Sequence, residues 1–170
     1  MITLILPGSS LKNKDWALEA KNFLEPEIPV KIYEWTHWSG GTEADFNAFS
    51  ERDKILQIIG SQNIHILAKS IGTLITCLLS EKIAKQIDKI ILCGIPMGVA
   101  LKEGTVYSEE LQKISPEKIR LFQNKNDPYG NFTQASEFIK KINPDFKMAP
   151  MPRSDHHYPY YREFKTFLLS

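Results

Sequence analysis

The segment that most constrains the fold of this 170-residue chain is residues 64–73, IHILAKSIGT. Its apolar first half predicts a buried strand, and a helix-like pattern begins immediately after Ser70. Ala68 and Gly72 stand two residues either side of this serine, where a tight strand-to-helix turn leaves no room for large side chains. Such a turn, the nucleophile elbow, mounts a reactive serine. We therefore interpret Ser70 as a candidate nucleophile, the structural alternative being a helix N-cap serine.

Two further segments supply the residue types that would activate such a serine. Residues 118–123 predict a strand, and the polar turn after it contains Asp127. A serine hydroxyl is a weak nucleophile at neutral pH, so an imidazole must take its proton and a carboxylate must orient the imidazole. We therefore expect a triad of Ser70, Asp127 and His156. His157 is the alternative base, because only one of the two adjacent histidines can face the serine.

These residues and their order resemble those of a small α/β-hydrolase, along nearly the whole chain. Serine, aspartate and histidine follow one another in the order of that family, and residues 155–158 (DHHY) match its Asp-His-x-aromatic pattern, which selects His156. The opening residues 2–10, ITLILPGSS, look like its first core strand and oxyanion loop. The Pro-Gly form of this loop is similar to the retinoblastoma-binding serine hydrolase group. Ala68 and Lys69 depart from the family, which has glycine and commonly histidine there.

The resemblance implies an activity and its alternatives. The backbone N–H groups of Ser9 and Ile71 would form the oxyanion hole, the second at the positive end of a helix. The expected reaction is cleavage of an ester, thioester or amide through an acyl-enzyme intermediate. An acyltransferase could use the same triad, and a hydrolase scaffold could also serve as a non-catalytic binding protein. Nothing in the sequence requires a cofactor, and no zinc, phosphate-loop or dinucleotide motif is present.

Strand and helix patterns alternate along the chain and predict an α/β fold. Such alternation places helices on both faces of a sheet, so we expect a three-layer α/β/α sandwich with a mostly parallel sheet of about six strands. The resemblance implies the strand order 2-1-3-4-5-6, in one domain covering residues 1–170. The predicted strands are residues 2–6, 30–34, 64–68, 89–93, 118–123 and 146–150. The predicted helices are residues 15–24, 44–60, 71–86, 107–114, 131–142 and 159–169.

The connections between these elements predict an open substrate site. The segment between the strands near residues 90 and 120 has room for about one helix, which is too little for a cap domain. Loops after the second strand, after the fourth strand and beside the acid would then form the walls of the pocket. The candidate pocket residues are Trp35, His37, Trp38, Pro96, Met97 and Tyr129.

Charge and cysteine content limit the possible partners. The net charge is +1 and the two signs are interspersed, so the chain lacks the electrostatic footprint of a nucleic-acid or anionic-membrane binder. Cys77 and Cys93 fall in apolar patterns and are expected to be buried small hydrophobes. No window approaches the length of a membrane span, and the expected location is cytoplasmic. The expected partner is a small-molecule acyl substrate; the oligomeric state stays open.

Overall fold

The computed structural model describes residues 1–170 and contains one sheet of six strands, all of them parallel. The spatial order is β2-β1-β3-β4-β5-β6, as predicted. The strands are β1 (Ile2–Leu6), β2 (Val30–Ile32), β3 (Ile64–Lys69), β4 (Ile87–Cys93), β5 (Ile119–Asn124) and β6 (Met148–Met151). The four inner strands are mostly buried apolar runs, which is characteristic of parallel sheets, whereas the edge strands β2 and β6 are more exposed.

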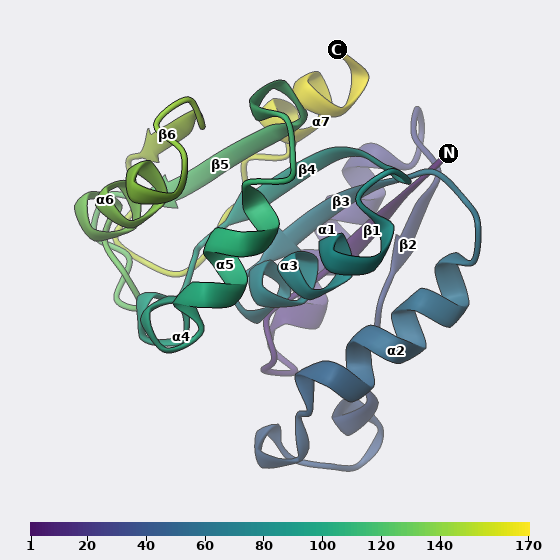
Figure 1. Cartoon of the computed structure of the whole chain (residues 1–170). Coiled ribbons are helices and arrows are strands. Elements are labelled where there is room, and N and C mark those ends of the chain that lie inside the picture. The colour runs from purple at the N-terminus through teal and green to yellow at the C-terminus, as the bar shows by residue number, and fades with distance from the viewer.

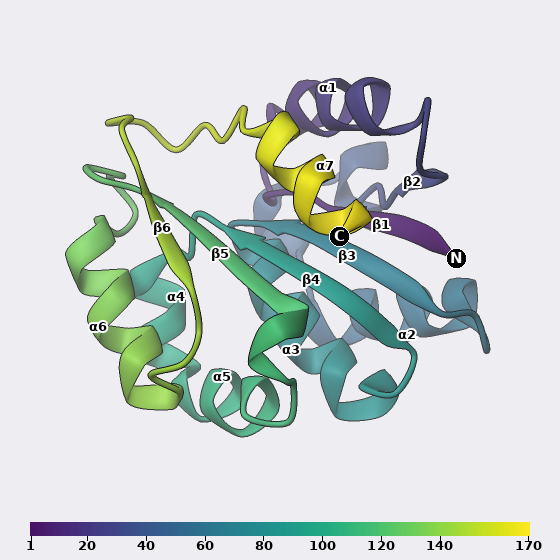
Figure 2. The same ribbon diagram turned by 90° about the horizontal axis from the view of Figure 1, so that it is seen from above.

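Helices cover both faces of the sheet and complete the predicted three-layer α/β/α architecture. Helices α1 and α7 lie on one face, and α2 to α6 lie on the other (Figure 1, Figure 2). The α-helices are α1 (Asn13–Leu24), α2 (Ala48–Ile59), α3 (Ile71–Ile83), α4 (Met97–Lys102), α5 (Gly104–Leu111), α6 (Phe132–Ile142) and α7 (Tyr161–Leu169). Short 3₁₀ turns are η1 (Thr36–Ser39), η2 (Glu43–Asp45) and η3 (Pro116–Lys118).

Two predicted helices differ from the observed ones. The predicted helix 44–60 is divided into η2 and α2, because Asn47 caps α2 by accepting a hydrogen bond from the Ser50 amide. Between β4 and β5 there are two short helices, α4 and α5, where one was predicted. Neither change adds a cap domain, because both short helices pack on α3 at the face of the sheet.

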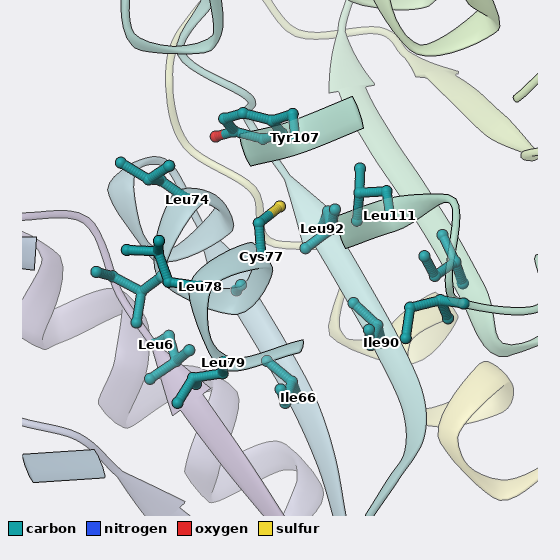
Figure 3. Close-up of a cluster of buried hydrophobic side chains, with 14 of the residues drawn as sticks. Leu6, Ile66, Leu74, Cys77, Leu78, Leu79, Ile90, Leu92, Tyr107 and Leu111 are labelled. Atoms are coloured by element: carbon teal, nitrogen blue, oxygen red, sulfur yellow. The ribbon is translucent and has the colours of Figure 1, made fainter. Parts of the chain in front are cut away.

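The apolar core is divided by the sheet into two clusters. Strand residues alternate between them: Ile90 and Leu92 belong to the cluster under α3, and Ile91 belongs to the cluster under α1 and α7. Figure 3 shows side chains of α3, such as Cys77 and Leu79, meeting those of the strands. Cys77 and Cys93 are both buried and free, as predicted.

Helix α3 is the most deeply packed helix, and it directly follows the proposed nucleophile. Ten of its 13 residues are buried, so the start of the helix has little freedom to move against the sheet.

No helix of the structure combines the length and the apolar character that a membrane span requires.

The carboxyl ends of the central strands meet at one edge of the sheet. Lys69 at the end of β3 pairs with Cys93 at the end of β4, and Cys93 pairs with Phe122 near the end of β5. The residues that follow these strands, which include Ser70 and Gly94, therefore share this edge. Open parallel sheets bind ligands at this edge.

Candidate active site

Ser70 occupies a strained turn between β3 and α3. Its φ of 56° and ψ of −123° make it the only non-glycine residue with positive φ. Such a conformation costs on the order of 1–3 kcal/mol and persists only where the surrounding structure imposes it. The Ser70 amide donates to the Cys93 carbonyl at 3.0 Å, which ties the turn to the neighbouring strand. The strand–turn–helix context predicted for this serine is thus present.

Gly72 allows the turn to approach the sheet closely. A Cβ atom at this position would lie 2.2 Å from the carbonyl oxygen of Leu6, at the end of β1. Only glycine fits there. The start of α3 is consequently pressed against the end of β1, next to the loop Pro7–Ser10, which we call the oxyanion loop.

Asp127 and His156 are in direct contact. The imidazole Nδ1 donates to Asp127 Oδ2 at 2.6 Å, and Asp127 Oδ1 accepts the Tyr129 amide at 2.8 Å. The Asp127 side chain is completely buried, and the His156 side chain is 16% exposed. A carboxylate that holds Nδ1–H leaves Nε2 of a neutral imidazole free to accept a proton.

His156 lies against Gly94, the residue after β4, and the Ser70 amide is bonded to the carbonyl of Cys93, the residue before Gly94. Gly94 has a φ of +63°, and a Cβ atom on it would lie 2.9 Å from Cε1 of His156. Nε2 of His156 is buried and has no hydrogen-bond partner. The Ser70 hydroxyl makes no hydrogen bond to this nitrogen; hydrogen bonds between a nucleophile and its base commonly tighten when substrate binds.

His157 does not reach Asp127. Its backbone carbonyl accepts the Asn124 side-chain amide at 2.9 Å, and its ring makes no hydrogen bond. Burial, followed by the nearby charge of Lys69, lowers the pKa of His157. Of the two adjacent histidines, His156 is the one joined to the predicted acid.

Tyr158 is a site residue that the sequence analysis did not single out. Its hydroxyl donates to Asp127 Oδ2 at 2.5 Å and accepts the Asn124 amide at 3.1 Å. Burial raises the pKa of Tyr158, so the phenol stays protonated and acts as a donor. The sequence signal for this residue is the aromatic position of the Asp-His-x-aromatic pattern at residues 155–158.

The two amides expected in the oxyanion hole are available as donors. The Ser9 N–H makes no hydrogen bond within the protein, although the Ser9 carbonyl accepts from His37 and Trp38. Ile71 is the first residue of α3, where a backbone N–H has no intrahelical acceptor. Because Gly72 presses this helix end against β1, the two amides lie on adjoining segments.

Lys69, where the resemblance leads us to expect histidine, is buried, and its side chain lies against α1. Its Nζ donates to Asn13 Oδ1 at 2.5 Å and lies 5.4 Å from the centre of the Trp16 ring. Burial lowers the pKa of Lys69, against the opposing effect of Asp127 and other acidic groups. No group of three or more His, Cys, Asp or Glu side chains is arranged to hold a metal ion.

Comparisons with known proteins bear on the fold. No protein-family model matches the chain, and no curated protein is similar to it in sequence. Est1E from Butyrivibrio proteoclasticus, solved with ferulic acid bound, is 14% identical with a TM-score of 0.74, over 99% of this chain and 88% of that one. Alpha/beta hydrolase domain-containing protein 10 from mouse is 12% identical with a TM-score of 0.70, over 98% and 87%. A membrane phospholipase A, described as a bacterial virulence factor, is 13% identical with a TM-score of 0.73, over 98% and 77%.

This chain has the α/β-hydrolase fold. The likeness predicted from the nucleophile elbow, the oxyanion loop and the order of the triad is therefore confirmed for the architecture. At these low identities the neighbours establish the fold alone, and the chemistry has to be argued from the residues of the site.

The α/β-hydrolase fold places the three aromatic residues after β2 against the oxyanion loop. Trp35 is completely buried, so it forms part of the core and not of an open pocket wall. His37 and Trp38 line a surface hollow of about 850 Å3 beside the loop. Its other lining residues are Ser10, Leu11, Lys12, Lys14, Asp15, Gly41, Thr42 and Glu43.

The other three predicted pocket residues of this α/β-hydrolase fold lie beside His156, for Tyr129, and at the start of α4, for Pro96 and Met97. Tyr129 is 62% exposed, and its ring centre lies 4.6 Å from that of His156, so it flanks the site directly. Met97 is nearly buried and lines a hollow of about 190 Å3 with Leu101 and Phe138. Pro96 is buried at the start of α4.

Proposed function

We propose that this protein is a serine hydrolase that cleaves an ester, thioester or amide by way of an acyl-enzyme intermediate. The observation that carries the proposal is the buried Asp127–His156 hydrogen bond of 2.6 Å, which leaves His156 Nε2 without a partner at the edge that Ser70 occupies. A buried imidazole nitrogen without a partner is costly unless a function requires it. General-base catalysis is such a function.

In the proposed reaction each of these residues has one role. Ser70 Oγ attacks the substrate carbonyl while His156 Nε2 takes the hydroxyl proton, and Asp127 stabilises the imidazolium that forms. The Ser9 and Ile71 amides hold the oxyanion of the tetrahedral intermediate, which collapses as His156 returns the proton to the leaving group. Water then attacks the acyl-enzyme while His156 takes one of its protons, and the second tetrahedral intermediate collapses as His156 returns that proton to Ser70 Oγ and the acid is released.

The strained elbow supports this assignment over an N-cap serine. The Ser70 side chain caps no amide of α3, so the N-cap alternative lacks its defining hydrogen bond. Backbone strain concentrates at functional positions. A cap serine also adopts a relaxed extended conformation, and the observed positive φ differs from it.

Labelling with a fluorophosphonate tests the proposal, because this reagent reacts with a serine only when a base activates it. We expect stoichiometric labelling that maps to Ser70 and disappears in Ser70→Ala and His156→Ala. His157→Ala is the matched control, since it removes the adjacent imidazole that does not contact Asp127, and it should still be labelled. Labelling lost in His157→Ala and kept in His156→Ala would reverse the choice of base.

A non-catalytic binding protein is the second candidate, favoured by the missing hydrogen bond between the Ser70 hydroxyl and His156. A folded wild type that is neither labelled nor active on p-nitrophenyl acetate would support this candidate and contradict the hydrolase. If labelling succeeds, product analysis with added alcohols or thiols separates the acyltransferase from the hydrolase. A hydrolase releases the free acid in their presence, whereas an acyltransferase yields the new ester or thioester.

A further inference from the structure

The oxyanion loop accepts hydrogen bonds from the ring N–H groups of three residues, Trp35, His37 and Trp38. The indole N–H of Trp35 donates to the carbonyl oxygen of Gly8 at 3.0 Å, in a buried setting. The Ser9 carbonyl receives His37 Nε2 at 2.8 Å and Trp38 Nε1 at 2.6 Å. Since a carbonyl oxygen can only accept, His37 carries its proton on Nε2. Two consecutive carbonyls of one loop are thus fixed by ring N–H groups.

These carbonyl contacts also control the amides of the loop. A peptide unit is planar and trans, so its C=O and its N–H point in opposite directions. The Gly8 oxygen and the Ser9 N–H belong to the same peptide unit. The Trp35 hydrogen bond therefore directs the Ser9 N–H away from the indole, and it keeps the unit from rotating. A donor on the oxygen further polarises the unit and strengthens its N–H as a donor.

The indole that donates this hydrogen bond is tightly packed. Trp35 is 0% exposed, and its ring makes edge contacts with Tyr33 at 5.1 Å and Phe46 at 5.2 Å between ring centres. Tyr33 is fixed in turn by its hydroxyl, which donates to the buried Glu51 carboxylate at 2.6 Å. The other oxygen of Glu51 accepts the backbone amide of the residue after Trp35, at 3.3 Å. The indole N–H is thus held in place by α2 and by the core.

We propose that Trp35 is a positioning residue of the oxyanion hole, whose indole N–H presets the direction of the Ser9 amide through the Gly8 carbonyl. The inference rests on the proposed function and assigns Trp35 a role without substrate contact. His37 and Trp38 fix the following peptide unit, which stops the loop from turning about Ser9. The free Ser9 N–H is the group that this arrangement leaves available to the substrate oxygen.

Trp35→Phe tests the proposal, because it keeps an aromatic ring in the core and removes the N–H. The readouts are kcat and KM for p-nitrophenyl acetate, and the affinity for phenylboronic acid, whose tetrahedral adduct with Ser70 presents an oxygen to the oxyanion hole. Loss of a direct oxyanion donor costs about 10²–10³-fold in kcat. For a misdirected donor we expect a fall in kcat of about tenfold or more, a KM within about twofold of the wild type, and a parallel loss of boronate affinity.

The control variant is Ser80→Ala, which removes a buried hydroxyl that donates to the Thr76 carbonyl at 2.9 Å inside α3. It should lower stability without changing kcat or boronate affinity. If Trp35→Phe does not fold, β-(3-benzothienyl)alanine at position 35 keeps the indole shape and still lacks the N–H. Wild-type kcat and boronate affinity in a folded variant would overturn the inference. Failure of the proposed function is a different result, in which the wild type itself is neither labelled by the fluorophosphonate nor active.

Discussion

The hydroxyl of Tyr158 donates to Asp127 Oδ2 at 2.5 Å, the same oxygen that receives His156 Nδ1 at 2.6 Å. Asp127 thus carries two strong donors on one oxygen and the Tyr129 amide on the other. A completely buried carboxylate needs such partners, because an unpaired buried charge is expensive. The tyrosine holds the carboxylate in the orientation in which it meets His156 Nδ1.

Tyr158→Phe is predicted to impair both catalysis and stability. A hydrogen bond to a charged group contributes roughly 1.5–3 kcal/mol, and we expect a loss within or slightly below this range in the free energy of unfolding. We also expect kcat to fall by about tenfold, because Asp127 loses a group that fixes its position. Urea unfolding and steady-state kinetics measure the two effects.

Tyr160→Phe provides the matched comparison for that substitution. Tyr160 is also a buried tyrosine, and its hydroxyl donates to Asn124 Oδ1 at 2.6 Å without touching Asp127. Its loss should cost about 1 kcal/mol of stability and leave kcat within about twofold. Equal kinetic effects of the two substitutions would show that Tyr158 acts only through general packing.

Gly72→Ala is predicted to disrupt the elbow, and Gly98→Ala is predicted to be tolerated. The new Cβ at position 72 would lie 2.2 Å from the Leu6 carbonyl, so β1 and α3 would have to separate. Forced overpacking of this kind costs about 1–3 kcal/mol or more. At position 98 no atom lies within 4 Å, and alanine should stabilise α4 by about 0.5 kcal/mol. Thermal unfolding measures the stability of both variants, and equal melting temperatures would contradict the prediction.

Ser70→Gly is predicted to be more stable than Ser70→Ala, although both are inactive. The positive φ of 56° strains any residue with a side chain, whereas glycine adopts it freely. Glycine has more backbone entropy in the unfolded state, which offsets part of the relieved strain. The glycine variant should still have a free energy of unfolding about 1 kcal/mol higher than that of the alanine variant. Chemical denaturation of both variants gives this difference directly, and an alanine variant as stable as the glycine variant would rule out stored strain in the elbow.

The sequence was sufficient to predict the architecture, and it singled out Asp127 and His156, two side chains that are hydrogen-bonded to each other in the structure. Strand and helix patterns are local, and the elbow pentapeptide is constrained by the close contact that Gly72 makes with Leu6. The order of serine, acid and histidine then leaves few ways to arrange a triad. His156 was selected over His157 by the pattern alone, and the structure joins His156 to Asp127.

The sequence could not predict the roles of the aromatic residues after β2. Whether Trp35 faces a pocket or the core depends on the direction that the chain takes at η1, after the strand. Glu51 on α2 fixes this direction, because its carboxylate accepts hydrogen bonds from the Tyr33 hydroxyl and the Thr36 amide. The sequence separation between Tyr33 and Glu51 is 18 residues, so no local pattern reports the contact. One helix was predicted where the structure has the two short helices α4 and α5. The reason is related, since both helices pack against α3, a contact that no local pattern reports.

Lys69 predicts a specific pH dependence of stability. Burial lowers its pKa below the ordinary 10.5, which the unfolded chain retains, so between the two values the unfolded state binds more protons. The free energy of unfolding therefore rises with pH in this window, by about 1.4 kcal/mol for each unit of pKa shift. Lys69→Met lacks this contribution, so wild-type stability minus variant stability should increase as the pH approaches 10.5.

Urea unfolding at intervals from neutral pH upward measures this difference, with Lys12→Met, at an exposed position, as the control for loss of a charge alone. Buried tyrosines such as Tyr158, whose pKa values are raised, titrate in the wild type and in Lys69→Met alike, and they cancel in the difference. Asp127 and Asp155 favour the charged lysine, but burial is the larger effect and sets the sign. A difference that stays flat or falls with pH would mean that Lys69 is more hydrated in solution than its contacts with Asn13 and Trp16 indicate.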